Sequence, residues 1–101
     1  MTKQTMKDYY VYILKCSDDS YYTGVTNNLE KRVGEHQSGI IKGYTSKRLP
    51  VELAFSERFT DINQAIRFEK QVKGWSRKKK EALTNRDFDL LVTLSNTKKK
   101  K

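Results

Sequence analysis

Two helical segments predicted from the sequence carry polar residues on faces that should be apolar. In residues 62–73, Glu69 falls between Ile62 and Val72 in an apolar stripe when each residue advances about 100°. A carboxylate is rarely buried unless it is paired or binds a metal. Two interpretations stay open: a structural salt bridge with an interior arginine, or a carboxylate that holds a hard cation such as Mg²⁺ or serves acid–base chemistry.

Arg32 and His36 stand one helical turn apart in the predicted helix at residues 27–38. Both border the apolar face defined by Leu29 and Val33. A cation and an imidazole on one face could bind a common anion. The alternative is a core histidine whose ring nitrogens are satisfied by hydrogen bonds.

Two tyrosines are expected to share one face of a β-hairpin. Tyr12 and Tyr22 fall on a common face if residues 9–15 and 21–26 pair around a turn at 16–20. Strand tyrosines usually pack against neighbours and hydrogen-bond through the hydroxyl. Gly24 in the second strand indicates a bulge or a close approach to the backbone.

The charge of the chain is uneven along its length. The 101 residues contain 21 Lys+Arg and 12 Asp+Glu, for a net charge of +9. Four of these cations are the final residues, Lys98 to Lys101, and residues 67–80 hold seven cations against the single acid Glu69. A basic stripe of this kind favours phosphate backbones as partners, although a solvated, solubilising face would have the same composition.

Local signals predict the elements that must position these residues. Three strands are expected at residues 9–15, 21–26 and 51–57, and alternation puts Val51, Leu53 and Phe55 on one face of the third. Helices are expected at 27–38, 61–73 and 76–83, with a short apolar turn at 88–94; their capping residues are Asn27, Asp61, Ser76 and Asp87. Gly39 and Gly74 follow the first two helices. The order β-β-α-β-α-α indicates an α+β fold, with helices packed on a small three-stranded mixed sheet.

The length allows one domain, at residues 9–94, between an N-terminal extension at 1–8 and a basic, disordered tail at 95–101. No apolar run resembles a membrane helix or a signal peptide. The single cysteine, Cys16, excludes an internal disulfide and a cysteine-rich zinc site. We therefore expect a monomeric cytoplasmic protein.

The ordered set of motifs resembles the GIY-YIG nuclease domain, in particular its small stand-alone bacterial members. The resemblance covers residues 9–83 and depends on five features: Tyr10-Val11-Tyr12, Tyr22-Thr23-Gly24, Arg32-x-x-x-His36, Gly43-Tyr44-Thr45 and Glu69. Tyr10-Val11 replaces the Gly-Ile of the first motif, and Thr23 replaces the Ile of the second.

The resemblance implies a DNA endonuclease, structure-selective or weakly specific, with RNA open as a second substrate. Glu69 would hold one Mg²⁺ or Mn²⁺ ion, Tyr12 would be the general base with help from Tyr22, and Arg32 would bind the phosphate. His36 would contact the phosphate, shuttle protons or orient Tyr22. The implied nucleic-acid-binding residues are Tyr44, Lys70, Lys73, Arg77, Lys78, Lys79 and Lys80.

A second function of another class fits the same features. A nucleic-acid-binding module could keep the fold and the basic stripe without cleaving its ligand. A thiol enzyme built on Cys16 and His36 is disfavoured, because no oxyanion-forming glycine cluster accompanies the cysteine. Trp75 is expected to fill the core rather than to stack on a base.

Overall fold

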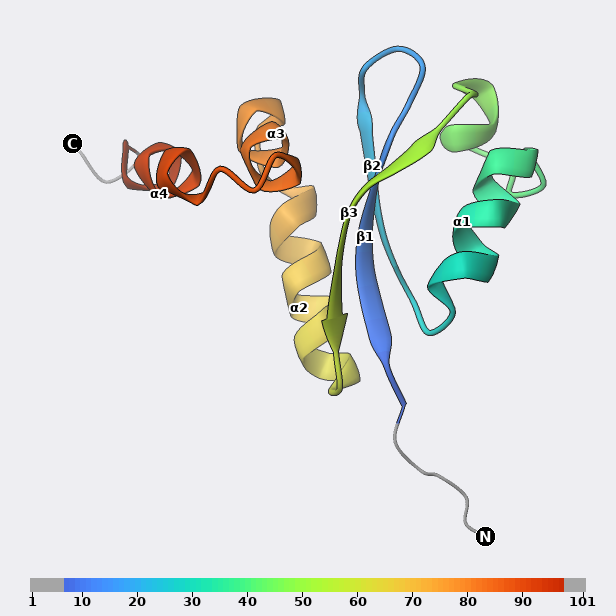
Figure 1. Ribbon diagram of the computed structural model, residues 1–101, viewed down its shortest axis with the longest axis horizontal. Coiled ribbons are helices and arrows are strands. Elements are labelled where there is room, and N and C mark those ends of the chain that lie inside the picture. The colour runs from blue at the N-terminus through green and yellow to red at the C-terminus, as the bar shows by residue number, and fades with distance from the viewer. Residues whose placement is uncertain (1–6, 98–101) are drawn as a thin grey trace, which may run out of the picture.

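The computed structural model describes residues 7–97 and places three antiparallel strands at its centre (Figure 1). Strands β1 (Tyr9–Lys15) and β2 (Tyr21–Thr26) form the predicted hairpin, and β3 (Glu52–Phe59) pairs with the other edge of β1. The order β2-β1-β3 makes β1 the central strand and leaves β2 at an edge. All pairs are antiparallel, so the expectation of a mixed sheet was wrong.

A β-bulge changes the faces of the third strand. Ile13 pairs with Phe55, whereas its neighbour Leu14 pairs with Leu53, so one extra residue lies on β3. Val51 therefore packs with Leu14 on one side of the sheet, and Phe55 packs with Ile13 on the other. Leu53 is 42% exposed. The prediction that Val51, Leu53 and Phe55 share one face was wrong, because an inserted residue shifts the alternation by one.

The first helix, α1 (Leu29–Ser38), begins one residue later than the sequence predicts. Asn28, not Asn27, caps it by accepting a hydrogen bond from the Lys31 amide at 3.2 Å. The hydroxyl of Thr26 accepts from the Asn28 amide and so fixes the turn that places this cap. Gly39 ends the helix at φ 83°, a left-handed conformation that glycine adopts without steric cost.

Three further helices follow β3: α2 (Ile62–Lys73), α3 (Arg77–Thr84) and α4 (Phe88–Thr97). Asp61 and Ser76 cap α2 and α3 as predicted, and Asp87 accepts a hydrogen bond from the Leu90 amide at the start of α4. The observed order is β-β-α-β-α-α-α. Helix α4 extends over residues 95–97, where the tail was expected, while residues 98–101 and most of the N-terminal extension, 1–6, lie outside the described part.

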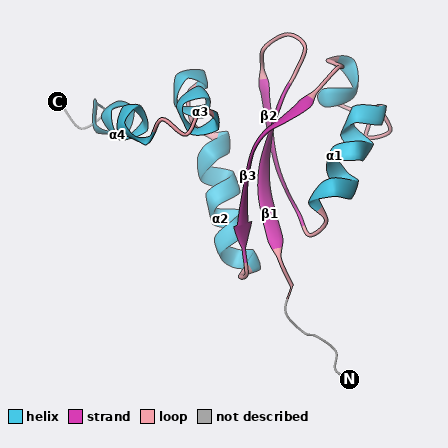
Figure 2. Ribbon diagram, viewed as in Figure 1, coloured by secondary structure: helices cyan, strands magenta, loops and turns pink. Residues whose placement is uncertain are grey.

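Helices cover both faces of the sheet (Figure 2). On one face, α1 contributes Leu29 and Val33 to a core with Tyr12 and Leu14. On the other, α2 and α3 pack Val72 and Leu83 against Ile13 and Phe55. Trp75 packs against this second core, as expected. Within residues 7–97, no helix is long and apolar enough to span a membrane.

Gly24 lies opposite Tyr12 in the hairpin, and the tyrosine ring occupies the space of the missing side chain. A Cβ at Gly24 would meet the Tyr12 hydroxyl oxygen at 2.5 Å and its Cζ at 2.6 Å. This is the close approach that the sequence indicates. Gly34, in the middle of α1, differs because a Cβ there would have no neighbouring atom within 4 Å.

We expect Gly24→Ala to destabilise the fold by about 1–3 kcal/mol, because the ring of Tyr12 must move. Gly34→Ala is the matched control and should stabilise the protein by up to about 1 kcal/mol through helix propensity. Urea unfolding of both variants measures the difference. Equal stability of Gly24→Ala and the unsubstituted protein would contradict the close packing of Tyr12 on β2.

Candidate active site

The Tyr12 side chain links the elements of the site. It belongs to the central strand, is only 1% exposed, and carries its hydroxyl across Gly24 to the edge strand β2. The Tyr22 ring lies on the same face, with its centroid 6.4 Å from that of Tyr12 and 5.0 Å from that of His36. Three aromatic groups from β1, β2 and α1 thus converge at one border of the sheet.

His36 is buried, at 1% exposure, and both of its ring nitrogens have partners. Nε2 lies 3.0 Å from the Tyr12 hydroxyl, and Nδ1 lies 2.7 Å from Oγ1 of Thr45. Thr45 is itself buried, in a short 3₁₀ turn, Thr45–Lys47, between α1 and β3. A neutral imidazole has one N–H donor and one acceptor, so the contacts form a chain along which one proton can shift. The sequence pointed to Tyr44 in this loop and missed Thr45, the residue that reaches the histidine.

The environment keeps both members of the Tyr12–His36 pair uncharged. Burial raises the pKa of the Tyr12 phenol above its usual value, although the neighbouring Arg32 guanidinium opposes this by hydrogen bonding and by its charge. Burial also lowers the pKa of His36, and the positive charge of Arg32 adds to that effect. Near neutral pH, Tyr12 therefore holds its proton and His36 is able to accept one.

Glu69 on α2 is 8% exposed, which agrees with its predicted place in an apolar stripe. Its Oε2 lies 2.7 Å from Nζ of Lys73, one turn further along the same helix. The ion-pair partner is thus a partly exposed lysine and not an interior arginine. The Glu69 carboxylate raises the pKa of Lys73 through this hydrogen bond, and it lies near enough to the phenol to raise the pKa of Tyr12.

Arg32 is the partly exposed cation of the site. Its Nε lies 3.5 Å from Oε1 of Glu35, also partly exposed, so the contact is long and leaves most guanidinium donors available. The sequence grouped Arg32 with His36 as partners for a common anion. The structure keeps His36 inside, on Tyr12 and Thr45, and leaves Arg32 as the group of the two that an anion can reach.

The donor set fits a weakly held divalent cation and does not form a preformed cage. Among residues 7–97 there is no cluster of three or more His, Cys, Asp or Glu that could hold a metal. Glu69 offers one hard carboxylate, near enough to Tyr12 for its charge to raise the pKa of that phenol. Mg²⁺ is often bound by one or two carboxylates, with water and substrate phosphate oxygens as its other ligands.

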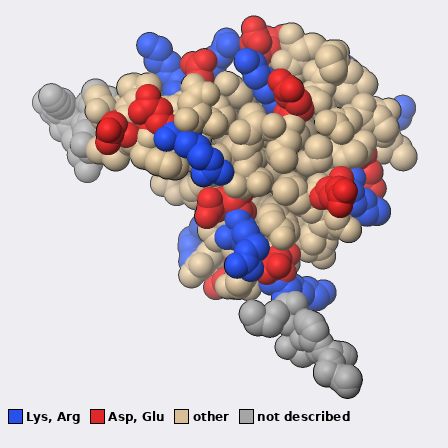
Figure 3. All heavy atoms as spheres, in the orientation of Figure 1, with Lys and Arg blue, Asp and Glu red and all other residues tan. Residues whose placement is uncertain are grey.

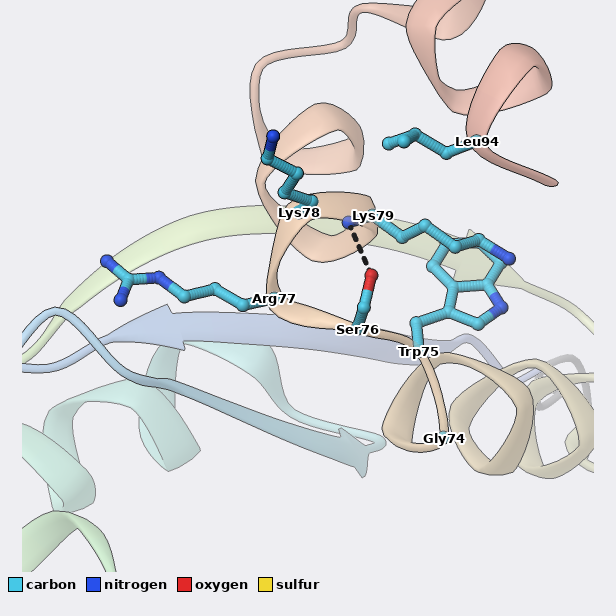
Figure 4. A pocket seen from close by; sticks show the side chains of 7 residues that line it. All are labelled: Gly74, Trp75, Ser76, Arg77, Lys78, Lys79 and Leu94. Atoms are coloured by element: carbon cyan, nitrogen blue, oxygen red, sulfur yellow. Dashed lines mark hydrogen bonds between the residues drawn. The ribbon is translucent and has the colours of Figure 1, made fainter. Parts of the chain in front are cut away.

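The predicted nucleic-acid-binding residues do not form one strip. Lys73 and Lys80 line a cleft with Tyr22 and Tyr44, and the Tyr44 ring stacks on Tyr22 at 6.1 Å. Lys78 and Lys79 instead line a separate cavity beside Trp75, shown in Figure 4, where Nζ of Lys79 lies 4.4 Å above the indole. Arg77 lines the cavity beside Trp75 and also a third cavity, which it shares with Tyr44 and Lys80. Lys70 is exposed on α2 and lines none of these cavities.

Cations and acids are interspersed on the face of the molecule seen in Figure 3. That face has no continuous basic patch. Lys73 and Lys80 are the basic residues that line the cleft beside Tyr22.

The chain is similar to proteins of a known family. The family model of the GIY-YIG catalytic domain matches residues 8–82. The UPF0213 protein NP_0776A of Natronomonas pharaonis is 49% identical over 76 residues, which are 75% of this chain and 89% of the relative. The UPF0213 protein SH2523 of Staphylococcus haemolyticus is 44% identical over 75 residues, 74% and 92% of the two chains.

Two solution NMR structures are similar to this one. The UPF0213 protein BH0048 from Bacillus halodurans aligns with a TM-score of 0.52 at 42% identity, over 77% of this chain and 83% of that protein. The protein EF2693 from E. faecalis aligns with a TM-score of 0.55 at 35% identity, over 89% and 93%. With a matching catalytic-domain model over most of its length and relatives of this identity, the chain belongs to the GIY-YIG family, among the small single-domain UPF0213 proteins.

Proposed function

We propose that this protein is a divalent-metal-dependent endonuclease that hydrolyses phosphodiester bonds in DNA. The observation that carries the proposal is the hydrogen-bonded chain from Tyr12 through His36 to Thr45, together with the buried Glu69 carboxylate, whose charge acts on the Tyr12 phenol. Such a chain can take a proton from an attacking water, and a carboxylate at the same place can hold a cation against a phosphate.

The chemistry assigned to the side chains is a proton relay. Tyr12 accepts a proton from the water that attacks phosphorus, while its own hydroxyl proton passes to Nε2 of His36. In this arrangement Nδ1–H of His36 donates to Thr45. The bond from phosphorus to the leaving oxygen breaks as the new bond to water forms. The leaving oxygen then takes a proton from solvent, and His36 releases to solvent the proton that it accepted. A relay of this kind does not require a free phenolate, which burial of Tyr12 disfavours.

One cation of the chain, Arg32, and one bound ion would bind the phosphate. Arg32 can donate two hydrogen bonds to its oxygens as negative charge builds on them. Glu69 would hold one Mg²⁺ or Mn²⁺ ion, which supplies Lewis-acid charge when bound. Lys73, which pairs with Glu69 at 2.7 Å, is placed to neutralise this carboxylate in the absence of the ion. Tyr22 lies beside the phenol of Tyr12 and would line the substrate side.

The Glu69–Lys73 ion pair also favours the second candidate function. A carboxylate already neutralised by a lysine has less affinity for a cation, and a protein of this kind could bind nucleic acid without cutting it. The two functions differ in one result: metal-dependent cleavage that depends on Glu69.

We expect Glu69→Gln and Tyr12→Phe each to lower cleavage by about 100-fold or more, because each removes a group from the reaction. The assay uses labelled single-stranded, flapped, branched and duplex DNA, with RNA of the same sequences, and either Mg²⁺ or Mn²⁺. Glu81→Gln, an exposed carboxylate on α3, is the matched control and should cut normally.

Equal residual cutting by Glu69→Gln, Tyr12→Phe and the unsubstituted protein would indicate a contaminating nuclease. Binding of the same substrates with no cutting under any metal would support the binding module instead.

Thr45→Val tests whether the hydrogen bond with Thr45 holds His36 in place. The valine leaves Nδ1 of His36 buried without a partner, which we expect to cost about 1–3 kcal/mol of stability and to lower cleavage as the imidazole loses its orientation. Thr45→Ser keeps the hydroxyl and should retain both properties. Urea unfolding and cleavage rates give the two readouts, and full activity of Thr45→Val would remove Thr45 from the relay.

The pH dependence of cleavage is expected to follow His36. As a proton acceptor it must be neutral, and burial holds its pKa below the usual value of about 6.5. The cleavage rate should therefore be at its maximum at neutral pH and should fall as the pH drops through this lowered pKa. The charge of Glu35 raises the pKa of His36, so Glu35→Gln should move the acid limb to lower pH. Profiles of kcat/KM against pH test this; an acid limb that Glu35→Gln leaves in place contradicts the role of His36.

A further inference from the structure

A cleft of about 300 Å³ continues from the candidate site along β2. It is lined by Tyr21, Tyr22, Thr23, Tyr44, Lys73 and Lys80. Because successive residues of a strand point to opposite faces, Tyr21 and Tyr22 can line one cleft only where it runs along the strand's edge. Lys73 binds Glu69 at 2.7 Å, so the cleft adjoins the candidate catalytic groups directly.

A second cavity, of about 240 Å³, extends the first. The two share Tyr21, Tyr44 and Lys80, and the second adds Arg77 together with Asp18 and Ser20 from the hairpin turn. The pair of cavities thus forms one path between the hairpin and α3, which starts at Lys73 and ends at Arg77. We call this path the edge track.

An unsatisfied polar atom lies in the wall of the edge track. Thr23 is 3% exposed and lines the first cavity, and its Oγ1 is the one buried side-chain N or O atom of the described residues with no hydrogen-bond partner. Buried hydroxyls without a partner are uncommon in folded proteins, because the lost hydration is not replaced. Because this oxygen is buried, a ligand in the track could accept a hydrogen bond from it only if the Thr23 side chain turns toward the cleft.

Two of the three cations of the edge track, Arg77 and Lys80, are free to bind an anion, while Lys73 is paired with Glu69. Neither Arg77 nor Lys80 forms an ion pair with another described residue. The acid at the far end, Asp18, is already paired with Arg48 at 3.0 Å. Arg48 also lies 3.8 Å from the centre of the Tyr44 ring and so fixes that aromatic wall.

We propose that the edge track binds an unpaired nucleic-acid strand next to the scissile phosphate. Thr23, Lys80 and Arg77 bind its phosphates, and the tyrosines contact its bases. Aromatic side chains interleaved with cations along a groove are the combination by which proteins hold single strands. This inference rests on the proposed function, since the track starts at Lys73, the ion-pair partner of Glu69. It names the substrate class: nucleic acid with an unpaired strand beside the cut, such as a flap or a fork.

A pair of double variants on one helix tests the charges. Arg77→Ala/Lys80→Ala removes the two unpaired cations of the track, and Lys78→Ala/Lys79→Ala removes two others from α3. Affinity is measured by fluorescence anisotropy with EDTA, on a single-stranded DNA oligonucleotide and its duplex, over a series of salt concentrations. The first variant should weaken single-strand binding and lower the slope of log Kd against log salt by about 1.4, as each single-strand phosphate contact contributes about 0.7. The control should keep the slope.

Thr23→Val and Thr23→Ser test the hydroxyl. Thr23→Val should raise the Tm, because it removes an unsatisfied buried group, and should weaken single-strand binding; Thr23→Ser should keep the affinity. A rise in Tm with unchanged affinity would overturn the role of Thr23. The proposal that the edge track binds single strands would be overturned by equal losses of affinity in the two double variants. Equal losses of affinity for the single strand and the duplex would overturn it as well.

These measurements need no cleavage, so they separate the two proposals. A protein that cuts DNA while Arg77→Ala/Lys80→Ala binds single strands normally refutes the edge track alone. A protein that never cuts, yet loses single-strand affinity in this variant, supports the track and refutes the nuclease.

Discussion

The contact of Tyr12 with Gly24 and His36 determines how the rest of the structure must be arranged. A tyrosine in the central strand can bring its hydroxyl to the sheet's edge only by crossing the neighbouring strand, and the absent side chain of Gly24 gives it room. The hydroxyl then needs a buried partner, which is His36 on α1. Helix α1 and the loop that carries Thr45 are consequently fixed against this face of the sheet.

Burial gives this contact its chemical character. It raises the pKa of Tyr12 and lowers that of His36, so the two groups share a proton without forming charges. Charged groups are instead placed around them: Arg32 on α1, partly exposed, and the Glu69–Lys73 pair on α2. The two faces of the sheet thus supply different parts, a neutral hydrogen-bonded chain from the α1 side and a charged pair from the α2 side.

The basic residues near residue 70 serve more than one purpose. Lys73 and Lys80 lie in the cleft next to Tyr22, while Lys79 packs over Trp75 and covers part of an indole that belongs to the second core. A run of cations in a sequence does not reveal this division, because neighbouring residues of a helix point in different directions.

The sequence by itself determined the elements and most of the candidate groups. The caps at Asp61 and Ser76, the Gly39 terminus and the two hairpin strands depend on residues within a few positions of one another, so local hydrogen bonding and alternation were enough to predict them. The burial of Glu69 followed in the same way from helical periodicity.

Only the tertiary structure decided which of these groups meet. The bulge in β3, the pairing of Glu69 with Lys73 in place of an arginine, and the contact of His36 with Thr45 were not predicted. Tyr12 and His36 are 24 residues apart, and their hydrogen bond exists because strand register and helix packing place one over the other. Periodicity tells which face of an element a side chain occupies, but the partner it finds there depends on how the elements pack.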